Sequence, residues 1–528
     1  MKNWLVFIVY VSVNLSFGQQ VDALVYFIDK PNVVPSLSNP QTILTQRALD
    51  RKNRHGVGID ERDVPVNQAY VNQIKNMSGI DYRTQSKWFN CMHVVGSVSS
   101  IEALELLPFV REVEFADPTL NRNTITEVNK YEDLITTPIA YGTASNQIEM
   151  IGLDDLHDQG FAGNNMIIAL TDSGFPNVDG NPGFQQLRDN NGLLGGYDFV
   201  AKDNSIYEDH FHGSRVLSVM AGSVTGQYEG TAPDAGFYLF RTEDTQSETP
   251  VEMSYWVAAA ERADSLGVDV INVSLGYLGF DNPSDGFTYQ DMDGQTTFIS
   301  KGSNIAYEKG LMVVTSAGNS GNSAVHPYIA APADATGSFS IGGVDDMEQR
   351  SSFSSIGPTI DGRTKPNVVA RASSTITIDE VGNIVGSSGT SFSAPLVSGA
   401  VACLMQAFPD MTAQEIRSAI ENSASQSTNP DVLVGYGIPD FGNAFRILNN
   451  EPVLRDGYTF INDGSSLQIA SLDSQELGRI ELYDLSGRMV ISVDVPQTTY
   501  VIPHGTFTTG LYIISISKFG ESRKLLLK

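Results

Sequence analysis

Four short, almost continuous apolar segments constrain the fold of this chain more than any other feature. They are residues 166–170, 236–240, 268–273 and 311–315. Strands that are apolar along their whole length are typical of parallel sheets, which are buried on both faces. Residues 252–266 and 394–407 have helical spacing and lie between or after these segments. The pattern predicts an α/β fold with a doubly wound, mostly parallel sheet over residues 146–449.

A smaller α/β unit is predicted before this region, over residues 19–116. Its expected strands and helices alternate along the chain: strands at 24–28, 88–95 and 110–115, helices at 43–52 and 66–76, and a further helix that opens at Ser100. Residues 117–145 are polar and lack apolar periodicity, so they are predicted to be a linker. An exposed linker between two folded units is where proteolytic processing is expected.

After about residue 451 the sequence no longer shows helical spacing of apolar residues. Apolar segments at 479–484, 489–493 and 510–516 are separated by turn residues and predict strands of a C-terminal β-sandwich. At 528 residues, the chain is long enough for several domains of this kind.

The first 18 residues resemble a secretory signal peptide. Lys2 precedes an apolar run at 5–11, and small residues follow at Ser16 and Gly18. We therefore expect export, to the cell surface or the medium. The formal net charge of −28 excludes a nucleic-acid partner, because neutralising phosphates needs a basic surface.

The two cysteines, Cys91 and Cys403, fall in different predicted domains. We expect no disulfide between them, although export would permit one.

Two polar motifs follow or open apolar elements in the predicted parallel domain. The strand at 166–170 runs into Asp172, at the sheet edge where α/β enzymes place their active sites. His212 precedes Gly-Ser and opens an apolar helix. Taken singly, Asp172 is better explained as a turn residue and His212 as a structural histidine. His210 and His212 could form a metal pair, but no third ligand lies nearby in the sequence, so we expect no metal.

Two further motifs complete a possible catalytic set. The strand at 311–315 leads through small residues to Asn319, whose side-chain amide can donate a hydrogen bond. Glycines and small residues at 386–390 lead to Ser391 at the start of an apolar helix, where the backbone N–H groups face any anion. Alone, Asn319 is explained as a turn former and Ser391 as a helix N-cap. A phosphate-binding loop would need Gly-Lys-Ser/Thr, which is missing here.

Together, in the order Asp, His, Asn and Ser, these motifs resemble the subtilisin-like serine peptidase (S8) family. The matching segments are Asp172-Ser-Gly, His212-Gly-Ser, Ala317-Gly-Asn and Gly389-Thr-Ser-Phe-Ser-Ala-Pro. The resemblance covers about residues 146–449. It implies Ser391 as nucleophile, His212 as general base, Asp172 as its orienting carboxylate and Asn319 as an oxyanion-hole donor. The reaction implied is hydrolysis of peptide bonds through an acyl-enzyme, which requires no cofactor.

The resemblance also implies how substrates bind. Ser274-Leu275-Gly276 matches the family segment that pairs with an extended protein or peptide substrate by strand addition. Arg215 and Ser214 depart from the residues usual in the family, a histidine and a threonine, but both lie outside the triad.

Residues 278–304 look like an insertion. Its Asp291-Met-Asp-Gly could contribute to a structural calcium site, but the spacing is not that of a known calcium loop, and a solvated loop explains it better.

The flanking units resemble known accessories of such enzymes. The unit at 19–116 is similar in position to the family propeptide, which acts as intramolecular inhibitor and folding assistant. Residues 482–490, 510–513 and 524–528 resemble the C-terminal sorting domain of the Bacteroidota type IX secretion system, which implies that machinery as a partner. A generic β-sandwich accessory domain is the alternative.

Two other functions remain open from the sequence. A surface-displayed binding protein on an inactive peptidase scaffold would have no need of all four polar residues. The sedolisin branch shares Gly-Thr-Ser but uses Glu and Asp where this chain has His212 and Asn319.

Overall fold

The computed structural model describes residues 20–121 and 144–449, and in the C-terminal part residues 458–462, 466–471, 476–484, 487–503, 510–516 and 521–527. The predicted signal peptide and most of the predicted linker lie outside these residues. We call residues 20–121 the N-terminal unit and residues 144–449 the central unit.

The N-terminal unit is a four-stranded antiparallel sheet with helices, in the strand order β2-β3-β1-β4. Its strands are β1 (Gln20–Phe27), β2 (Ile80–Ser86), β3 (Cys91–Ser97) and β4 (Val110–Phe115). Its helices are α1 (Val33–Ser38), α2 (Gln46–Arg54), α3 (Gln68–Lys75), α4 (Val98–Glu102) and α5 (Pro118–Asn121). The strand predicted at 88–95 begins only at Cys91, because residues 87–90 form the turn from β2.

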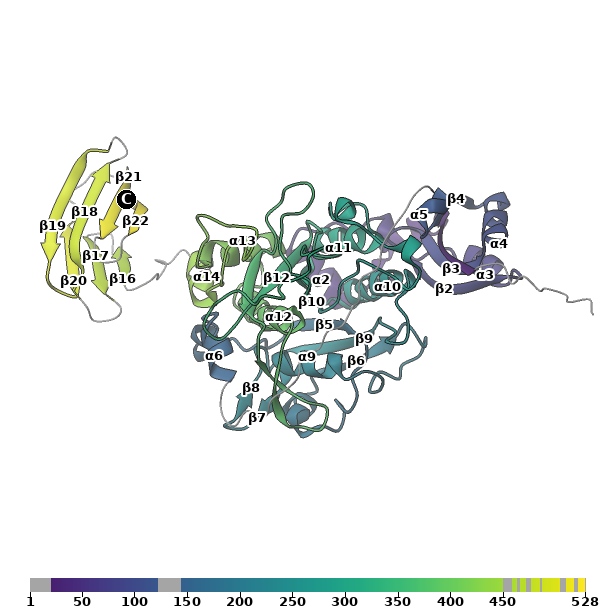
Figure 1. Ribbon diagram of the computed structural model, residues 1–528, viewed down its shortest axis with the longest axis horizontal. Helices are drawn as coiled ribbons and strands as arrows, with labels where there is room; N and C mark the ends of the chain where they lie inside the picture. Colours follow the sequence, from purple (N-terminus) through teal and green to yellow (C-terminus); the bar gives the residue numbers. More distant parts are fainter. Residues whose placement is uncertain are drawn as a thin grey trace, which may run out of the picture.

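The central unit is built on a seven-stranded sheet in which every neighbouring pair is parallel (Figure 1). The order is β13-β12-β11-β10-β5-β9-β6. The strands are β5 (Ile167–Asp172), β6 (Leu193–Asp198), β9 (Gly236–Arg241), β10 (Val270–Val273), β11 (Met312–Ser316), β12 (Ser338–Val344) and β13 (Val368–Arg371). The four apolar segments singled out from the sequence are β5, β9, β10 and β11.

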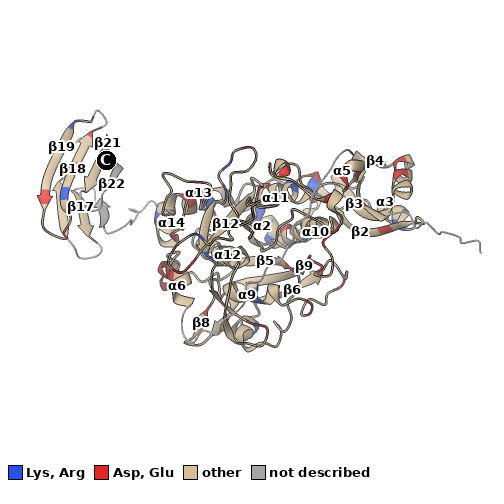
Figure 2. Ribbon diagram, viewed as in Figure 1, with Lys and Arg blue, Asp and Glu red and all other residues tan. Residues whose placement is uncertain are grey.

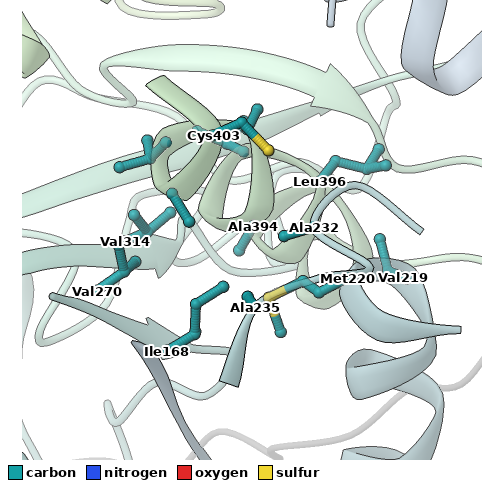
Figure 3. Close-up of a cluster of buried hydrophobic side chains, with 14 of the residues drawn as sticks. Ile168, Val219, Met220, Ala232, Ala235, Val270, Val314, Ala394, Leu396 and Cys403 are labelled. Carbon is teal, nitrogen blue, oxygen red and sulfur yellow. The ribbon is translucent and has the colours of Figure 1, made fainter. Parts of the chain in front are cut away.

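Helices cover both faces of this sheet. Successive side chains of each strand point to opposite sides, so strands that are apolar throughout place apolar side chains on both faces. On one face Ile168, Val270 and Val314 pack with residues of α9 (His212–Ala221) and α12 (Thr390–Ala407), as Figure 3 shows for Val219, Met220, Ala394 and Leu396. On the other face the alternate residues Ala169, Ile271 and Val313 pack with α10 (Val251–Leu266) and α11 (Phe298–Glu308). The sheet is therefore buried on both sides.

Helix α12 is long and apolar enough to cross a membrane, with a mean hydropathy of 1.2, but 89% of it is buried inside the protein. It is a core helix, and among the described residues no other helix meets that test. Its Cys403 is buried and so is Cys91, and both thiols are free.

The rest of the central unit connects these elements. Its other helices are α6 (Ala144–Glu149), α7 (Asp154–Asp158), α8 (Gln185–Asp189), α13 (Ala413–Ser423) and α14 (Phe441–Leu448). Two hairpins add β7 (Ser223–Val224) with β8 (Tyr228–Glu229), and β14 (Thr375–Ile378) with β15 (Ile384–Ser387). The irregular segment predicted at 278–304 is shorter than expected, because α11 begins at Phe298.

The described C-terminal residues form two antiparallel sheets, in the orders β16-β17-β20 and β19-β18-β21-β22. Their strands are β16 (Tyr458–Asn462), β17 (Ser466–Ser471), β18 (Gly478–Asp484), β19 (Met489–Val495), β20 (Thr499–Pro503), β21 (Gly510–Ile516) and β22 (Glu521–Leu527). Ile469 and Ile502 of the first sheet share one apolar cluster with Leu482 and Ile514 of the second.

Candidate active site

The predicted site residues meet at one edge of the central sheet. Asp172 is the last residue of β5, and the segments that contain Ser274 and Asn319 follow the neighbouring strands β10 and β11. His212 is the first residue of α9, and Ser391 lies in the first turn of α12. Because all strands are parallel, their carboxyl ends share this edge, which is where α/β folds bind ligands.

Asp172 and His212 form a buried pair. The imidazole Nδ1 lies 2.8 Å from Oδ1 and 3.0 Å from Oδ2 of Asp172, and both residues are at most 2% exposed. Oδ1 also accepts a hydrogen bond from the backbone N–H of Ser173 at 2.8 Å. A carboxylate can only accept, so Nδ1 carries a proton, and in the neutral ring Nε2 is then the basic nitrogen.

The glycine after His212 allows this pairing. A Cβ at position 213 would lie 2.4 Å from the carbonyl oxygen of Gly174 and 2.9 Å from Cβ of Asp172. Any larger residue would push the start of α9 away from the end of β5. The sequence His-Gly therefore sets how closely the helix approaches the carboxylate.

Ser391 stands where the chain turns sharply into α12. Gly389, with a φ of +140°, precedes the helix in a conformation that side chains rarely permit. Ser391 Oγ lies 3.4 Å from the carbonyl oxygen of Ser274, while Ser274 Oγ donates to the carbonyl oxygen of Ser391 at 2.9 Å. The ring of the next residue, Phe392, lies 5.8 Å from that of His212, centroid to centroid, so the two helix starts are adjacent.

Asn319 is held in one orientation by Thr390. Its side chain accepts hydrogen bonds from the backbone N–H of Thr390 at 2.9 Å and from the Thr390 hydroxyl at 3.0 Å. Since a backbone N–H can only donate, the atom facing it must be the amide oxygen. The amide nitrogen is then directed toward Gly389, 3.4 Å from the position a Cβ there would take. A hydrogen-bond donor thus lies beside the turn that carries Ser391.

Ser274-Leu275-Gly276 continues β10 beyond the sheet. The next residue, Tyr277, pairs with Ala331 through two backbone hydrogen bonds, of 2.7 and 3.2 Å. This antiparallel bridge keeps the segment extended beside Ser391. Leu275 is buried, whereas Gly276 is partly exposed.

Comparison with known proteins decides the family. Residues 163–437, just over half of the chain, match the model of the subtilase family (peptidase S8). This chain belongs to the subtilase family. Residues 22–131 match a second model, the peptidase S8 propeptide domain of Bacteroidota. This family assignment confirms the resemblance drawn from the four motifs.

Several characterised subtilases are similar to this one. Subtilisin DY of Bacillus licheniformis is 28% identical over 280 residues, which cover 53% of this chain and 90% of the relative. Subtilisin NAT of Bacillus subtilis subsp. natto is 28% identical over 326 residues, covering 60% and 77%. Among solved structures, that of the MycP3 protease from the type VII (ESX-3) secretion system is 21% identical, with a TM-score of 0.48, and covers 60% of this chain and 93% of MycP3. The family and its subtilisin relatives make this chain a serine-type endopeptidase with a propeptide domain.

The residues that depart from the family pattern have local partners in this subtilase. Arg215 stacks its guanidinium 4.3 Å from the ring centroid of Phe211 and contacts Glu380 of the β14–β15 hairpin at 3.3 Å. Ser214 donates to the carbonyl oxygen of Pro176 at 2.9 Å. His210 Nδ1 lies 3.4 Å from both Ser173 Oγ and the backbone nitrogen of His212. These contacts brace the turns around Asp172 and His212.

The acidic residues of the predicted insertion accept hydrogen bonds from neighbouring residues of the same loop. Asp291 accepts hydrogen bonds from the backbone N–H and hydroxyl of Thr288, and Asp293 accepts from the backbone N–H groups of Gln295 and Thr296. Within the part of the chain that the structure describes, no group of three or more His, Cys, Asp or Glu side chains is arranged to hold a metal ion.

Glu261 is a buried contact residue between the central and N-terminal units that the sequence analysis missed. It lies on α10, and its buried carboxylate accepts hydrogen bonds from Ser86 Oγ at 2.5 Å, from Lys87 N at 3.0 Å and from Trp88 N at 2.9 Å. The donors are the last residue of β2, Ser86, and the first two residues of the following turn in the N-terminal unit. Burial raises the pKa of Glu261. A glutamate within a helical pattern gives no local signal that its partner lies about 170 residues away.

Proposed function

We propose that this subtilase is an exported serine endopeptidase that uses Asp172, His212 and Ser391 as a catalytic triad. The observation that carries the proposal is the buried Asp172–His212 pair beside the helix start that bears Ser391. A fixed carboxylate, an imidazole and a hydroxyl at one site are the parts that acyl transfer by serine requires.

In the proposed reaction, Ser391 Oγ attacks the scissile carbonyl carbon while His212 Nε2 accepts the hydroxyl proton. This step needs a hydrogen bond from Ser391 Oγ to the imidazole, and catalytic hydrogen bonds often tighten only with substrate bound. Asp172 stabilises the imidazolium that results. The proton then passes to the leaving amine, and water hydrolyses the acyl-enzyme by the reverse sequence.

The negative charge that develops on the carbonyl oxygen is stabilised by two donors in this proposal. They are the side-chain amide of Asn319 and the backbone N–H of Ser391, at the positive end of α12. The Thr390 contacts support the first role, because they fix the amide before substrate arrives. Donors that need no reorganisation are the most effective in such a site.

We infer that substrates are extended polypeptides that pair with Ser274-Leu275-Gly276. Main-chain pairing supplies affinity without demanding a particular sequence. The extended backbone held by the Tyr277–Ala331 bridge supports this assignment.

The flanking parts have proposed roles in export and latency. We propose that residues 1–18 direct export. We also propose that the N-terminal unit, which the matched propeptide domain covers from residue 22 on, inhibits the enzyme and assists its folding until the linker at 117–145 is cut. We also propose that the two C-terminal sheets form a β-sandwich that is recognised by the type IX secretion machinery. Removing residues 458–528 should then leave the protein inside the cell envelope of a Bacteroidota host.

The central experiment is labelling with a fluorophosphonate, which reacts with activated serines. We expect processed protein to be labelled at Ser391 and to hydrolyse casein, more readily at neutral than at acidic pH, because a protonated imidazole cannot act as base. Ser391→Ala should abolish both, whereas Ser393→Ala, two residues further on the same helix, should keep both. Casein hydrolysis by the Ser391→Ala variant would refute the proposed site. A binding protein on an inactive scaffold, which no observation here favours, would show neither labelling nor hydrolysis.

A further inference from the structure

An open cavity of about 630 Å³ lies between the N-terminal and central units. We call it the interface cavity. Residues of α3 and β2 line it from the N-terminal unit, and residues of β6, of the loop after β6 and of α10 line it from the central unit. None of the proposed triad residues is among the described residues that line it. A cavity of this size is large enough for an organic ligand rather than for a single small ion.

The lining of the interface cavity is strongly cationic, although the chain has a net charge of −28. The cationic side chains are Lys75, Arg83 and Lys87 of the N-terminal unit and Lys202 and Arg262 of the central unit. A local excess of positive charge in an acidic protein indicates a site for an anion, provided that nearby carboxylates do not balance it.

The two carboxylates that line the cavity are already in use. Asp63 is bound by Lys309 Nζ at 2.7 Å. Glu261 accepts the three hydrogen bonds from Ser86 and the turn after it that are described above. Burial raises the pKa of Glu261, and the charge of Lys87 acts in the opposite direction, so this lysine and this glutamate balance each other.

Three of the cations lack a carboxylate partner. Of the described residues, none places a carboxylate within 4.0 Å of the charged nitrogens of Lys75, Lys202 or Arg262. Aromatic rings hold them instead: Lys75 Nζ lies 5.0 Å and Lys202 Nζ 5.6 Å from the centroid of the Tyr82 ring. The Arg262 guanidinium lies 4.8 Å from the centroid of the Tyr197 ring. A ring attracts a cation without neutralising it, so these charges stay available to a ligand.

The cations also act on one another. Burial lowers the pKa of Lys202, and the charges of Arg83 and Lys75 lower it further, whereas Asp81 opposes them. Asp81 is itself paired with Arg83, at 3.2 Å. Like charges held close together repel each other, and an anion bound between them would remove this cost. Lys202 Nζ donates one hydrogen bond, to Tyr82 O at 2.9 Å, and an ammonium group has three N–H donors.

We propose that the interface cavity binds a small organic polyanion that carries two or more phosphate or sulfate groups. More than one anionic group is needed because Lys75 belongs to one unit, and Lys202 and Arg262 belong to the other. The planar guanidinium of Arg262 can bind two oxygens of one such group, and the ammonium groups act as point charges. The ligand bridges the two units, so it binds only a chain that contains both. This site is independent of the proposed peptidase chemistry.

The test measures ligand binding to the full chain with Ser391→Ala, which prevents cleavage by the enzyme itself. The probes are sucrose octasulfate and inositol hexakisphosphate, and sucrose and inositol are the uncharged controls. Titration calorimetry at low ionic strength should show one polyanion bound per chain, with an affinity that falls as salt is added. The uncharged controls should not bind. A preference for one polyanion identifies sulfate or phosphate as the group that the site accepts.

Two variants test the bridging of the units. Lys75→Ala and Lys202→Ala each remove one exposed cation, so both proteins should fold like the parent. Each should weaken binding of the tighter probe about tenfold, as expected for loss of one hydrogen bond to a charged group. Lys301→Ala, on α11 and outside the cavity lining, removes the same charge and should bind within about twofold of the parent.

Three results would overturn the proposal. The first is that neither polyanion binds. The second is an unchanged affinity in Lys75→Ala or in Lys202→Ala, because the ligand would then not bridge the units. The third is an equal loss of affinity in Lys301→Ala, because binding would then depend on net charge alone. A failed fluorophosphonate experiment would refute the peptidase site without affecting this measurement.

Discussion

At the scale of single residues, the orientation of Asn319 leads to a measurable consequence. Asn319→Leu keeps the side-chain size but removes the donor that Thr390 holds in place. Loss of one oxyanion donor costs about 10²–10³ in kcat in comparable enzymes, so we expect a fall of that size with KM nearly unchanged. Steady-state kinetics on a chromogenic peptide measures it.

The control for this experiment is Ser320→Ala, at the next position. Its side chain is no part of the proposed oxyanion hole, so kcat should stay within about twofold of the parent value. A kcat for Asn319→Leu that differs less than about tenfold from the parent would exclude the amide as a principal oxyanion donor.

The proximity of the four polar residues at one edge of the sheet was expected from sequence, because each one sits in a local pattern. Asp172 and Asn319 follow apolar strands, and His212 and Ser391 open apolar helices. The partner that orients Asn319 could not be predicted, since Thr390 lies 71 residues away and its contact depends on how β11 and α12 meet. The sequence led to the proposed site residues, but their orientation could be described only from the fold.

At the scale of elements, the junction of α9 with β5 makes a steric prediction. Gly213→Ala would place a Cβ 2.4 Å from Gly174 O, a rigid backbone atom. We expect a loss of about 1–3 kcal/mol in the free energy of unfolding, together with loss of activity as His212 shifts from Asp172. Chemical denaturation and casein hydrolysis measure the two effects.

Gly180→Ala is the matched control, because nothing lies within 4 Å of a Cβ at that position. This variant should unfold at the parent denaturant concentration and keep full activity. If Gly213→Ala were equally stable and active, the close approach of α9 to β5 would not be needed to position the imidazole.

The start of α14 makes a prediction about pH. Asp440 caps this helix by accepting from Asn443 N at 2.8 Å, and burial raises its pKa to about 6. This pKa is above that of an unfolded aspartate, about 3.9. The contribution of Asp440 to the free energy of unfolding is therefore fully present below pH 4 and is lost as the pH rises through 6. Asp440→Asn keeps an N-cap without this charge and should raise stability at pH 8 by about 1–2 kcal/mol relative to the parent.

Thermal unfolding of both proteins at pH 5 and pH 8 checks this expectation. The difference in stability between Asp440→Asn and the parent should be larger at pH 8 than at pH 5. An equal difference at both pH values would mean that the charge of Asp440 is not what limits stability there.

The strands of the central sheet that could be predicted from sequence are those that are apolar along almost their whole length. Strands β5, β9, β10 and β11 are such segments, and all were expected. Strand β13 of the same sheet was not predicted, and neither were β6 and β12, in which paired glycines interrupt the apolar residues. Glycine suits these places because neighbouring atoms lie very close, for example Leu239 O at 1.9 Å from a Cβ on Gly196.

At the scale of the whole molecule, the contact between the N-terminal and central units determines which acidic side chains are buried, and the local sequence does not. Acidic residues are distributed over the ribbon in Figure 2, in keeping with the net charge of −28. Most of them face solvent, but Glu261, Asp264 and Asp269 are buried against the N-terminal unit. The sequence analysis used the net charge only to exclude a nucleic-acid partner. It could not distinguish these three residues from the other acidic ones, because their partners are some 170 to 220 residues distant.

Acid should therefore loosen the contact between the two units through Asp264. Burial alone would raise the pKa of this carboxyl, but Arg51, Lys52 and Lys87 outweigh burial and hold the pKa below its usual value. A depressed pKa stabilises the contact above the pKa of a free aspartate, about 3.9, and this stabilisation is lost as the pH falls through the lower value in the complex. When the linker of the Ser391→Ala protein is cut by an added site-specific protease, we expect the N-terminal fragment to dissociate faster as the pH falls below about 4.

Asp264→Asn separates this effect from general acid unfolding. Without a titrating group between Arg51 and Lys52, the variant should dissociate faster than the parent at pH 7, and its rate should depend less on acid. Circular dichroism of the central unit over the same pH range shows whether it stays folded while the fragment leaves. If parent and variant responded to acid alike, the acid sensitivity would have to come from other carboxylates, and Asp264 would not be the group that ties the N-terminal unit to the central unit.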